Sequence, residues 1–215
     1  MEHQLNFSYQ ARYQKYGQID SKTKDVWFVL HGYGQLAQFF IQKFRGLVQG
    51  KQCIIAPEGL SRFYLNGFSG RVGATWMTKE DRLTDIQNYL SYLNAIYQKE
   101  MEEVDRSSTT IHLLGFSQGT ATVTRWALQP QIHFDHLLLW AGILPYDVDL
   151  QVGKEKLKSK RLTLIYGDQD EFVTQERLEN QKEMLDAMEL EPRLFVFKGG
   201  HDIDQATLMK ISSLD

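Results

Sequence analysis

The sequence has one cysteine, no excess of positive charge and no long apolar run, and each shortage excludes a class of protein. Cys53 has no partner for a disulfide within the chain, and its place at the start of the apolar run 53–56 favours a small buried side chain over a reactive thiol. The 24 basic and 27 acidic residues give a net charge of −3, which offers no electrostatic support for a nucleic-acid partner. No run approaches the length of a membrane span, and the first residues lack the basic and apolar regions of a signal peptide. We therefore expect no membrane insertion and a cytoplasmic protein.

The length of 215 residues suits one domain over 1–215, built around a single core. One basic cluster, 154–161, is interrupted by Glu155, and we interpret it as a solvated face rather than an anion site. Nothing in the composition indicates the oligomeric state.

Short apolar runs alternate with segments of helical periodicity along most of the chain. This pattern predicts strands at about 26–30, 53–56, 109–114, 137–140, 162–166 and 193–197, an edge strand within 5–16, and helices at about 36–50, 78–103, 120–129, 174–190 and from 202 onward. Strands that alternate with helices favour a mostly parallel central sheet with helices on both faces. Residues 57–78 are predicted to be a long loop, which in a compact domain is usually functional or mobile.

The sequence 115–119, Gly-Phe-Ser-Gln-Gly, lies between a predicted strand and a predicted helix. Glycines two residues to either side of Ser117 suit a very tight strand-to-helix turn that lifts the serine hydroxyl clear of the sheet. The backbone N–H of Gln118 would then lie at a helix N-terminus, where it can receive developing negative charge. The motif therefore predicts a nucleophile, Ser117, and one donor of an oxyanion hole.

A serine hydroxyl needs a base to take its proton, most often a histidine held by a carboxylate. Among six histidines, His31 and His201 follow the carboxyl ends of predicted strands, which is the edge of a parallel sheet where Ser117 lies. His31 runs directly into Gly32 and is expected to brace a loop through hydrogen bonds. His201 follows two glycines in a turn, and we take it as the base.

Two aspartates follow the strand at 162–166 and compete for the role of the acid. Asp168 is next to Gly167 and suits a turn-forming role, whereas Asp170 is better placed to reach a neighbouring loop. Spacing favours Asp170 but leaves Asp168 open.

The order Ser117, Asp170, His201 on alternating strands and helices resembles the α/β-hydrolase fold. More narrowly, the motifs at 30–34, 115–119, 167–173 and 200–201 are similar to those of the phospholipase/carboxylesterase family, which includes the acyl-protein thioesterases. The resemblance implies that Asp170 is the acid and that the N–H of Tyr33 is the second oxyanion donor. We expect no metal or organic cofactor to take part. Two departures from the family pattern are Thr120 in place of a glycine and the absence of a proline after the acid.

The substrate pocket is harder to predict. Only about 20 residues separate the strand near Ala141 from the one near Leu162, enough for a crossover but not for a cap domain. The loop 57–78 leaves the sheet on the same edge as Ser117, and its aromatic residues, Trp76 and Phe68 in particular, could wall an apolar pocket. By the resemblance, Trp76 lies beside that pocket. The alternative is that these aromatic rings pack the loop onto the domain.

We expect a serine hydrolase that cleaves carboxylic esters, or thioesters, of a small-molecule or acylated substrate through an acyl-enzyme. The alternative from a different class is a catalytically silent binding module on the same fold, because a fold does not dictate function.

Overall fold

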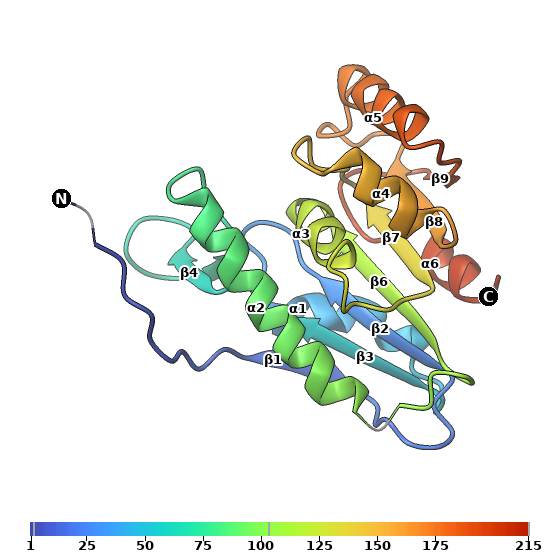
Figure 1. Cartoon of the computed structure of the whole chain (residues 1–215), viewed down its shortest axis with the longest axis horizontal. Helices are drawn as coiled ribbons and strands as arrows, with labels where there is room; N and C mark the ends of the chain where they lie inside the picture. The colour runs from blue at the N-terminus through green and yellow to red at the C-terminus, as the bar shows by residue number, and fades with distance from the viewer. Residues whose placement is uncertain (2, 103, 215) are drawn as a thin grey trace.

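The computed structural model describes residues 1, 3–102 and 104–214, and within them seven strands form a central sheet in the order β1-β3-β2-β6-β7-β8-β9 (Figure 1). Their bounds are β1 (Tyr13–Tyr16), β2 (Asp25–Leu30), β3 (Gln52–Pro57), β6 (Thr110–Phe116), β7 (His136–Trp140), β8 (Arg161–Gly167) and β9 (Arg193–Phe197). β1 pairs antiparallel with β3, and the other neighbours pair in parallel.

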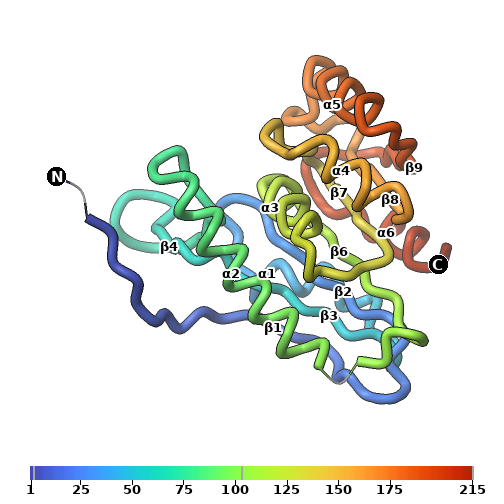
Figure 2. Tube along the Cα trace, viewed as in Figure 1, coloured from blue at the N-terminus to red at the C-terminus, as the bar shows by residue number. Residues whose placement is uncertain are grey.

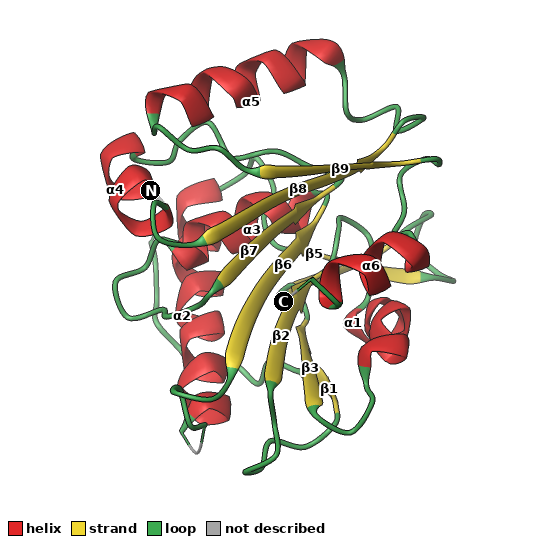
Figure 3. Ribbon diagram, turned by 90° about the vertical axis from the view of Figure 1, so that its right-hand side faces the viewer, coloured by secondary structure: helices red, strands yellow, loops and turns green. Residues whose placement is uncertain are grey.

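Helices cover both faces of this sheet (Figure 3). Alternate residues of β2 belong to separate cores: Phe28 shares one buried cluster with Leu93 and Trp126, whereas Trp27 shares the other with Phe44 and Leu208. A strand buried on both faces must be continuously apolar, which is why its sequence shows no alternation. The helices are α1 (Ala37–Phe40), the 3₁₀ helix η1 (Ile41–Leu47), α2 (Arg82–Met101), α3 (Gln118–Ala127), α4 (Leu150–Leu157), α5 (Gln175–Ala187) and α6 (Gln205–Ser212). The fold class predicted from the sequence is confirmed.

The strand order reverses at β2. From β2 the chain moves outward to β3, and then returns through α2 to β6 on the other side of β2, a path that Figure 2 traces. In parallel sheets a crevice forms at such a switch point, beyond the carboxyl ends of the two strands that flank it. The loop with Tyr33 follows β2 and Ser117 follows β6, so the topology brings both to this crevice.

The connection from β7 to β8, residues 141–160, contains one helix, α4, so it is a crossover without an inserted cap domain. No helix in the part of the chain that the structure describes is long and apolar enough to cross a membrane.

The predicted edge strand within 5–16 is shorter in the structure, where only β1 is a strand and Leu5 and Phe7 are exposed. The reason is the length of its neighbour. Tyr13 pairs with Pro57, the last residue of β3, so the residues before Tyr13 have no partner strand.

The segment 57–78, predicted to be an irregular loop, contains an antiparallel hairpin of β4 (Ser61–Tyr64) and β5 (Val72–Thr75). Backbone hydrogen bonds join this hairpin to the loop after β2: the N–H of Gly34 donates to Ala74 O at 2.9 Å, and the N–H of Ala74 donates to Gln35 O at 3.1 Å. The hairpin thus supports the loop that carries Tyr33. The helix predicted at 36–50 is also shorter, because α1 continues as the 3₁₀ helix η1.

Candidate active site

Ser117 connects β6 to α3 with a strained backbone, at φ +54° and ψ −117°. The turn is so tight that a Cβ on Gly115 would lie 2.2 Å from Gly119 O, and a Cβ on Gly119 would lie 2.3 Å from Leu30 O. Only glycine fits at either position, which explains the spacing seen in the sequence. Strain of this kind persists where the surrounding structure holds it, and it is frequent at functional sites.

Asp170 and His201 form a hydrogen-bonded pair beyond the carboxyl ends of β8 and β9. Nδ1 of His201 lies 2.8 Å from Oδ2 and 3.0 Å from Oδ1 of Asp170, whose side chain is 0% exposed. The rings of Phe116 and Phe172 lie 4.9 and 4.7 Å from the imidazole, centroid to centroid. These contacts fix both the orientation of the imidazole and the tautomer with its proton on Nδ1.

Asp168 has a different partner. Its Oδ1 accepts a hydrogen bond from the N–H of Gly199 at 2.9 Å, which ties the loop after β8 to the loop after β9. Of the two aspartates left open by spacing, the structure brings Asp170 to His201 and gives Asp168 a role in the turn.

His31 is buried and braces its loop. Nδ1 lies 2.8 Å from Gly32 O, and Nε2 accepts a hydrogen bond from the N–H of Gly59 at 2.9 Å. Burial lowers the pKa of His31 to about 4, so its imidazole is neutral near pH 7. The predicted bracing role matches these contacts.

The two predicted oxyanion donors lie on segments that hydrogen bonds hold in place. Gln118 is the first residue of α3, and its backbone N–H therefore has no partner within the helix. The side chain of Gln118 binds the end of the hairpin segment, accepting from the N–H of Trp76 at 3.2 Å and donating to Met77 O at 2.9 Å. Tyr33 lies beside Gly34, whose backbone is bonded to the same segment.

A cavity of about 910 Å³ joins these groups. Ser117, His201, Tyr33 and Gln118 all line it. Its other walls come from α3, the segment 141–146 after β7 and the inner face of α5. Ser117, His201 and both segments of the predicted oxyanion hole therefore open onto one space.

Trp76 and Phe68, predicted to wall the substrate pocket, are not among the residues that line this cavity. Trp76 is 2% exposed and stacks on His31 at 4.9 Å, with its indole N–H donating to His31 O at 2.8 Å. Phe68 is 97% exposed, near the tip of the hairpin. The hairpin explains the difference, because its base turns Trp76 into the core while its tip extends into solvent. The packing alternative fits Trp76, and the walls at 141–146 and α5 were not predicted.

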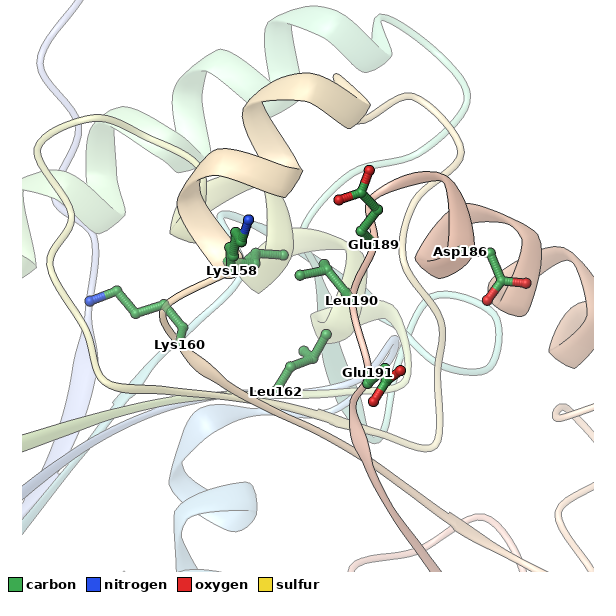
Figure 4. A pocket seen from close by; sticks show the side chains of 8 residues that line it. Lys158, Lys160, Leu162, Asp186, Glu189, Leu190 and Glu191 are labelled. Carbon is green, nitrogen blue, oxygen red and sulfur yellow. The ribbon is translucent and has the colours of Figure 1, made fainter.

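A second pocket, of about 590 Å³, lies among charged residues at the other end of the sheet (Figure 4). It involves Lys160 and Leu162 at the start of β8 and Glu191 just before β9. In a parallel pair these are the amino ends of the strands, opposite to Ser117. Among the described residues, no group of three or more histidine, cysteine, aspartate or glutamate side chains is arranged to hold a metal ion.

The sheet order and the serine turn define an α/β-hydrolase fold. Residues 17–214 match the sequence model of the phospholipase/carboxylesterase family, and the chain belongs to this family. Membership supports hydrolase activity of the carboxylesterase or thioesterase kind. No curated protein matches the chain closely enough in sequence to be counted as a relative.

Solved structures show the same fold at low sequence identity. Acyl-protein thioesterase 2 of Zea mays superposes with a TM-score of 0.72 at 15% identity, over 95% of this chain and 97% of that one. The esterase PE8 superposes with a TM-score of 0.68 at 21% identity, over 96% of this chain and 98% of that one. The carboxylesterase of Bacillus cereus superposes with a TM-score of 0.66 at 14% identity, over 95% of this chain and 92% of that one.

Proposed function

We propose that the protein is a serine hydrolase that cleaves a carboxylic ester or thioester through an acyl-enzyme, with Ser117, His201 and Asp170 as its triad. The observation that carries the proposal is the pair of Asp170 with Nδ1 of His201, at 2.8 Å, on a histidine that lines the same cavity as Ser117. With its Nδ1 proton held by the carboxylate, the imidazole presents Nε2 as the base.

In this mechanism Ser117 Oγ attacks the acyl carbon while His201 takes its proton. The backbone N–H groups of Tyr33 and Gln118 stabilise the oxyanion, and His201 then protonates the leaving group. Water enters, His201 again acts as the base, and the acid is released from Ser117. Asp170 stabilises the imidazolium that forms twice in each cycle. The substrate is a small-molecule or acylated ester, and the chain's own residues supply each step without a metal or organic cofactor.

A fluorophosphonate probe tests the proposal against a silent binding module. In an active triad, Ser117 attacks the probe and becomes phosphonylated with loss of fluoride. We therefore expect stoichiometric labelling of the wild type and no labelling of Ser117→Ala. The melting temperature of Ser117→Ala should equal that of the wild type. A wild-type protein that remains unlabelled, or a Ser117→Ala variant that still hydrolyses esters within tenfold of wild type, would contradict the assignment. A panel of matched oxygen esters and thioesters then identifies the leaving group.

A further inference from the structure

The wall that α5 contributes to the cavity contains a buried amide donor without an acceptor. Gln181 is 3% exposed and lines the cavity. Its Oε1 accepts the N–H of Leu144 at 2.7 Å, which fixes the orientation of the amide, and Nε2 has no hydrogen-bond partner among the described residues. A buried donor without an acceptor is destabilising, and such groups are rare in proteins. A ligand atom that accepts from Nε2 would remove this cost.

One turn earlier on α5 is a guanidinium that has no carboxylate partner among the described residues. Arg177 also lines the cavity, and within the described part of the chain its guanidinium has one hydrogen bond, from Nη1 to Phe172 O at 2.7 Å. Because the ring of Phe172 lies 4.7 Å from that of His201, Arg177 is near the triad. Residues four apart share one face of a helix, so the side chains of Arg177 and Gln181 are neighbours on the same wall.

The other charges around the cavity do not compete for this role. Arg82 and Arg125 both bind Asp147, at 2.5 and 2.7 Å, and this carboxylate holds both guanidinium groups in place. Among the described residues that line the cavity, Glu183 is the one carboxylate. Arg177 is therefore the cation of this wall that remains available to a ligand.

We propose that Arg177 and Gln181 bind a carboxylate on the substrate, so that the enzyme prefers esters with an acidic group in the acyl or the leaving part. One unpaired guanidinium next to one amide donor matches the single charge and two oxygens of a carboxylate, and Glu183 disfavours a more highly charged anion. This inference rests on the proposed function, because it assigns a substrate class to the same cavity.

Two pairs of esters test it, each with one acidic member. In the first pair the acyl group differs, 4-nitrophenyl hydrogen glutarate against 4-nitrophenyl hexanoate, and in the second the leaving group differs, 4-acetoxybenzoate against 4-methylphenyl acetate. The quantity measured is the ratio of kcat/KM for the acidic member to that for the neutral member. In Arg177→Met this ratio should fall about tenfold or more in at least one pair, as expected when a charge-assisted hydrogen bond is lost.

Gln181→Glu keeps an acceptor for the N–H of Leu144 but replaces the Nε2 donor with a second carboxylate oxygen. It should therefore also lower the ratio of acidic to neutral kcat/KM. Lys182→Met removes one positive charge from α5 at a position that does not line the cavity, and it should leave the ratio unchanged. A ratio that is unaffected in both pairs by Arg177→Met and Gln181→Glu, or that falls equally in Lys182→Met, would overturn the inference.

Equilibrium binding separates this inference from the proposed hydrolysis. Monomethyl glutarate should bind Ser117→Ala, and the dissociation constant should rise about tenfold or more when Arg177→Met is added. If the wild type turns over esters but Arg177→Met changes neither the ratio of acidic to neutral turnover nor the binding of monomethyl glutarate, the carboxylate site alone is refuted. Binding that depends on Arg177 in a protein without ester turnover would instead refute the hydrolase and retain the carboxylate site.

Discussion

Thr120 and Gly142 occupy adjoining space behind the serine turn. A Cβ on Gly142 would lie 2.4 Å from Thr120 Oγ1 and 2.8 Å from Ser117 O. The Thr120 hydroxyl is 2.6 Å from Ser117 O and 3.2 Å from Ile143 O, and its hydrogen bond is shared by these two carbonyl oxygens. Thr120 stands where the family pattern has a glycine, so in this chain a hydroxyl links the serine turn to the cavity wall, and Gly142 leaves room for it.

Gly142→Ala should therefore reduce kcat by about 10- to 100-fold, because the added methyl group displaces Ser117 or its loop. Adding Thr120→Ala should restore part of the loss, since it removes the nearest atom. Gly46→Ala is the matched control: its Cβ would meet one atom, Met209 Sδ, at 3.7 Å, and kcat should not change. A Gly142→Ala enzyme with wild-type kcat would show that the serine turn tolerates displacement.

Asp170→Asn should lower kcat by about 10⁴-fold, because the amide cannot stabilise the imidazolium and favours the wrong tautomer of His201. Asp168→Asn keeps an oxygen to accept the N–H of Gly199 and should change kcat little. Steady-state kinetics on one ester compares the two variants. If Asp168→Asn caused the greater loss, Asp168 would be the acid.

His31 should make the stability of the protein depend on pH. Burial lowers its pKa from 6.5 to about 4, so the unfolded chain takes up this proton at a higher pH than the folded protein does. Above pH 6.5 His31 is neutral in both states and does not change the free energy of unfolding. As the pH decreases from 6.5 to 4, proton uptake by the unfolded chain lowers the free energy of unfolding by about 3 kcal/mol. Urea unfolding across this range measures the slope.

His31→Gln is the control for that slope, because it retains an acceptor for the N–H of Gly59 but does not titrate. The difference between the slopes of wild type and His31→Gln no longer contains the pH dependence that the carboxyl groups give to both proteins. Equal slopes in wild type and His31→Gln would show that His31 is not responsible.

Trp76→Ala should destabilise the protein by about 3–5 kcal/mol, since it leaves a large cavity in the core and removes the hydrogen bond to His31 O. The preference among acyl chain lengths should remain that of the wild type, because Trp76 does not line the cavity next to Ser117. Phe68→Ala, at an exposed ring, should affect neither property. A changed chain-length preference with little loss of melting temperature would show that Trp76 contacts the acyl chain of the substrate.

The parallel sheet could be predicted because its strands, such as β2, are buried on both faces and are continuously apolar. The edge of the sheet that holds the site followed from the same pattern, since Ser117 and His201 come directly after strands. The hairpin at 61–75 gave no such signal, because its strands have four residues each and glycines lie within and between them. Without the hairpin, the inward turn of Trp76 could not be foreseen.

Gln181 was also missed, although the sequence carries a signal for it. It falls at the helical spacing of Leu178, Leu185 and Met188, where a core residue is expected. A polar side chain on an apolar stripe needs a hydrogen-bond partner, and that need could have marked it as a candidate. The segment 141–146 had no comparable signal, because loop walls depend on how the chain crosses between strands.

The hairpin is fixed at its base and free at its tip. Its base is bonded to Gly34 and Gln118, whereas at Gly67 and Gly70, both with positive φ, an added Cβ would meet no atom within 4 Å. The tip is therefore a place where this chain can be lengthened or labelled. A peptide tag inserted after Gly67, or a fluorophore attached at position 68, would report on the protein in solution while the serine turn and the Tyr33 loop keep their positions.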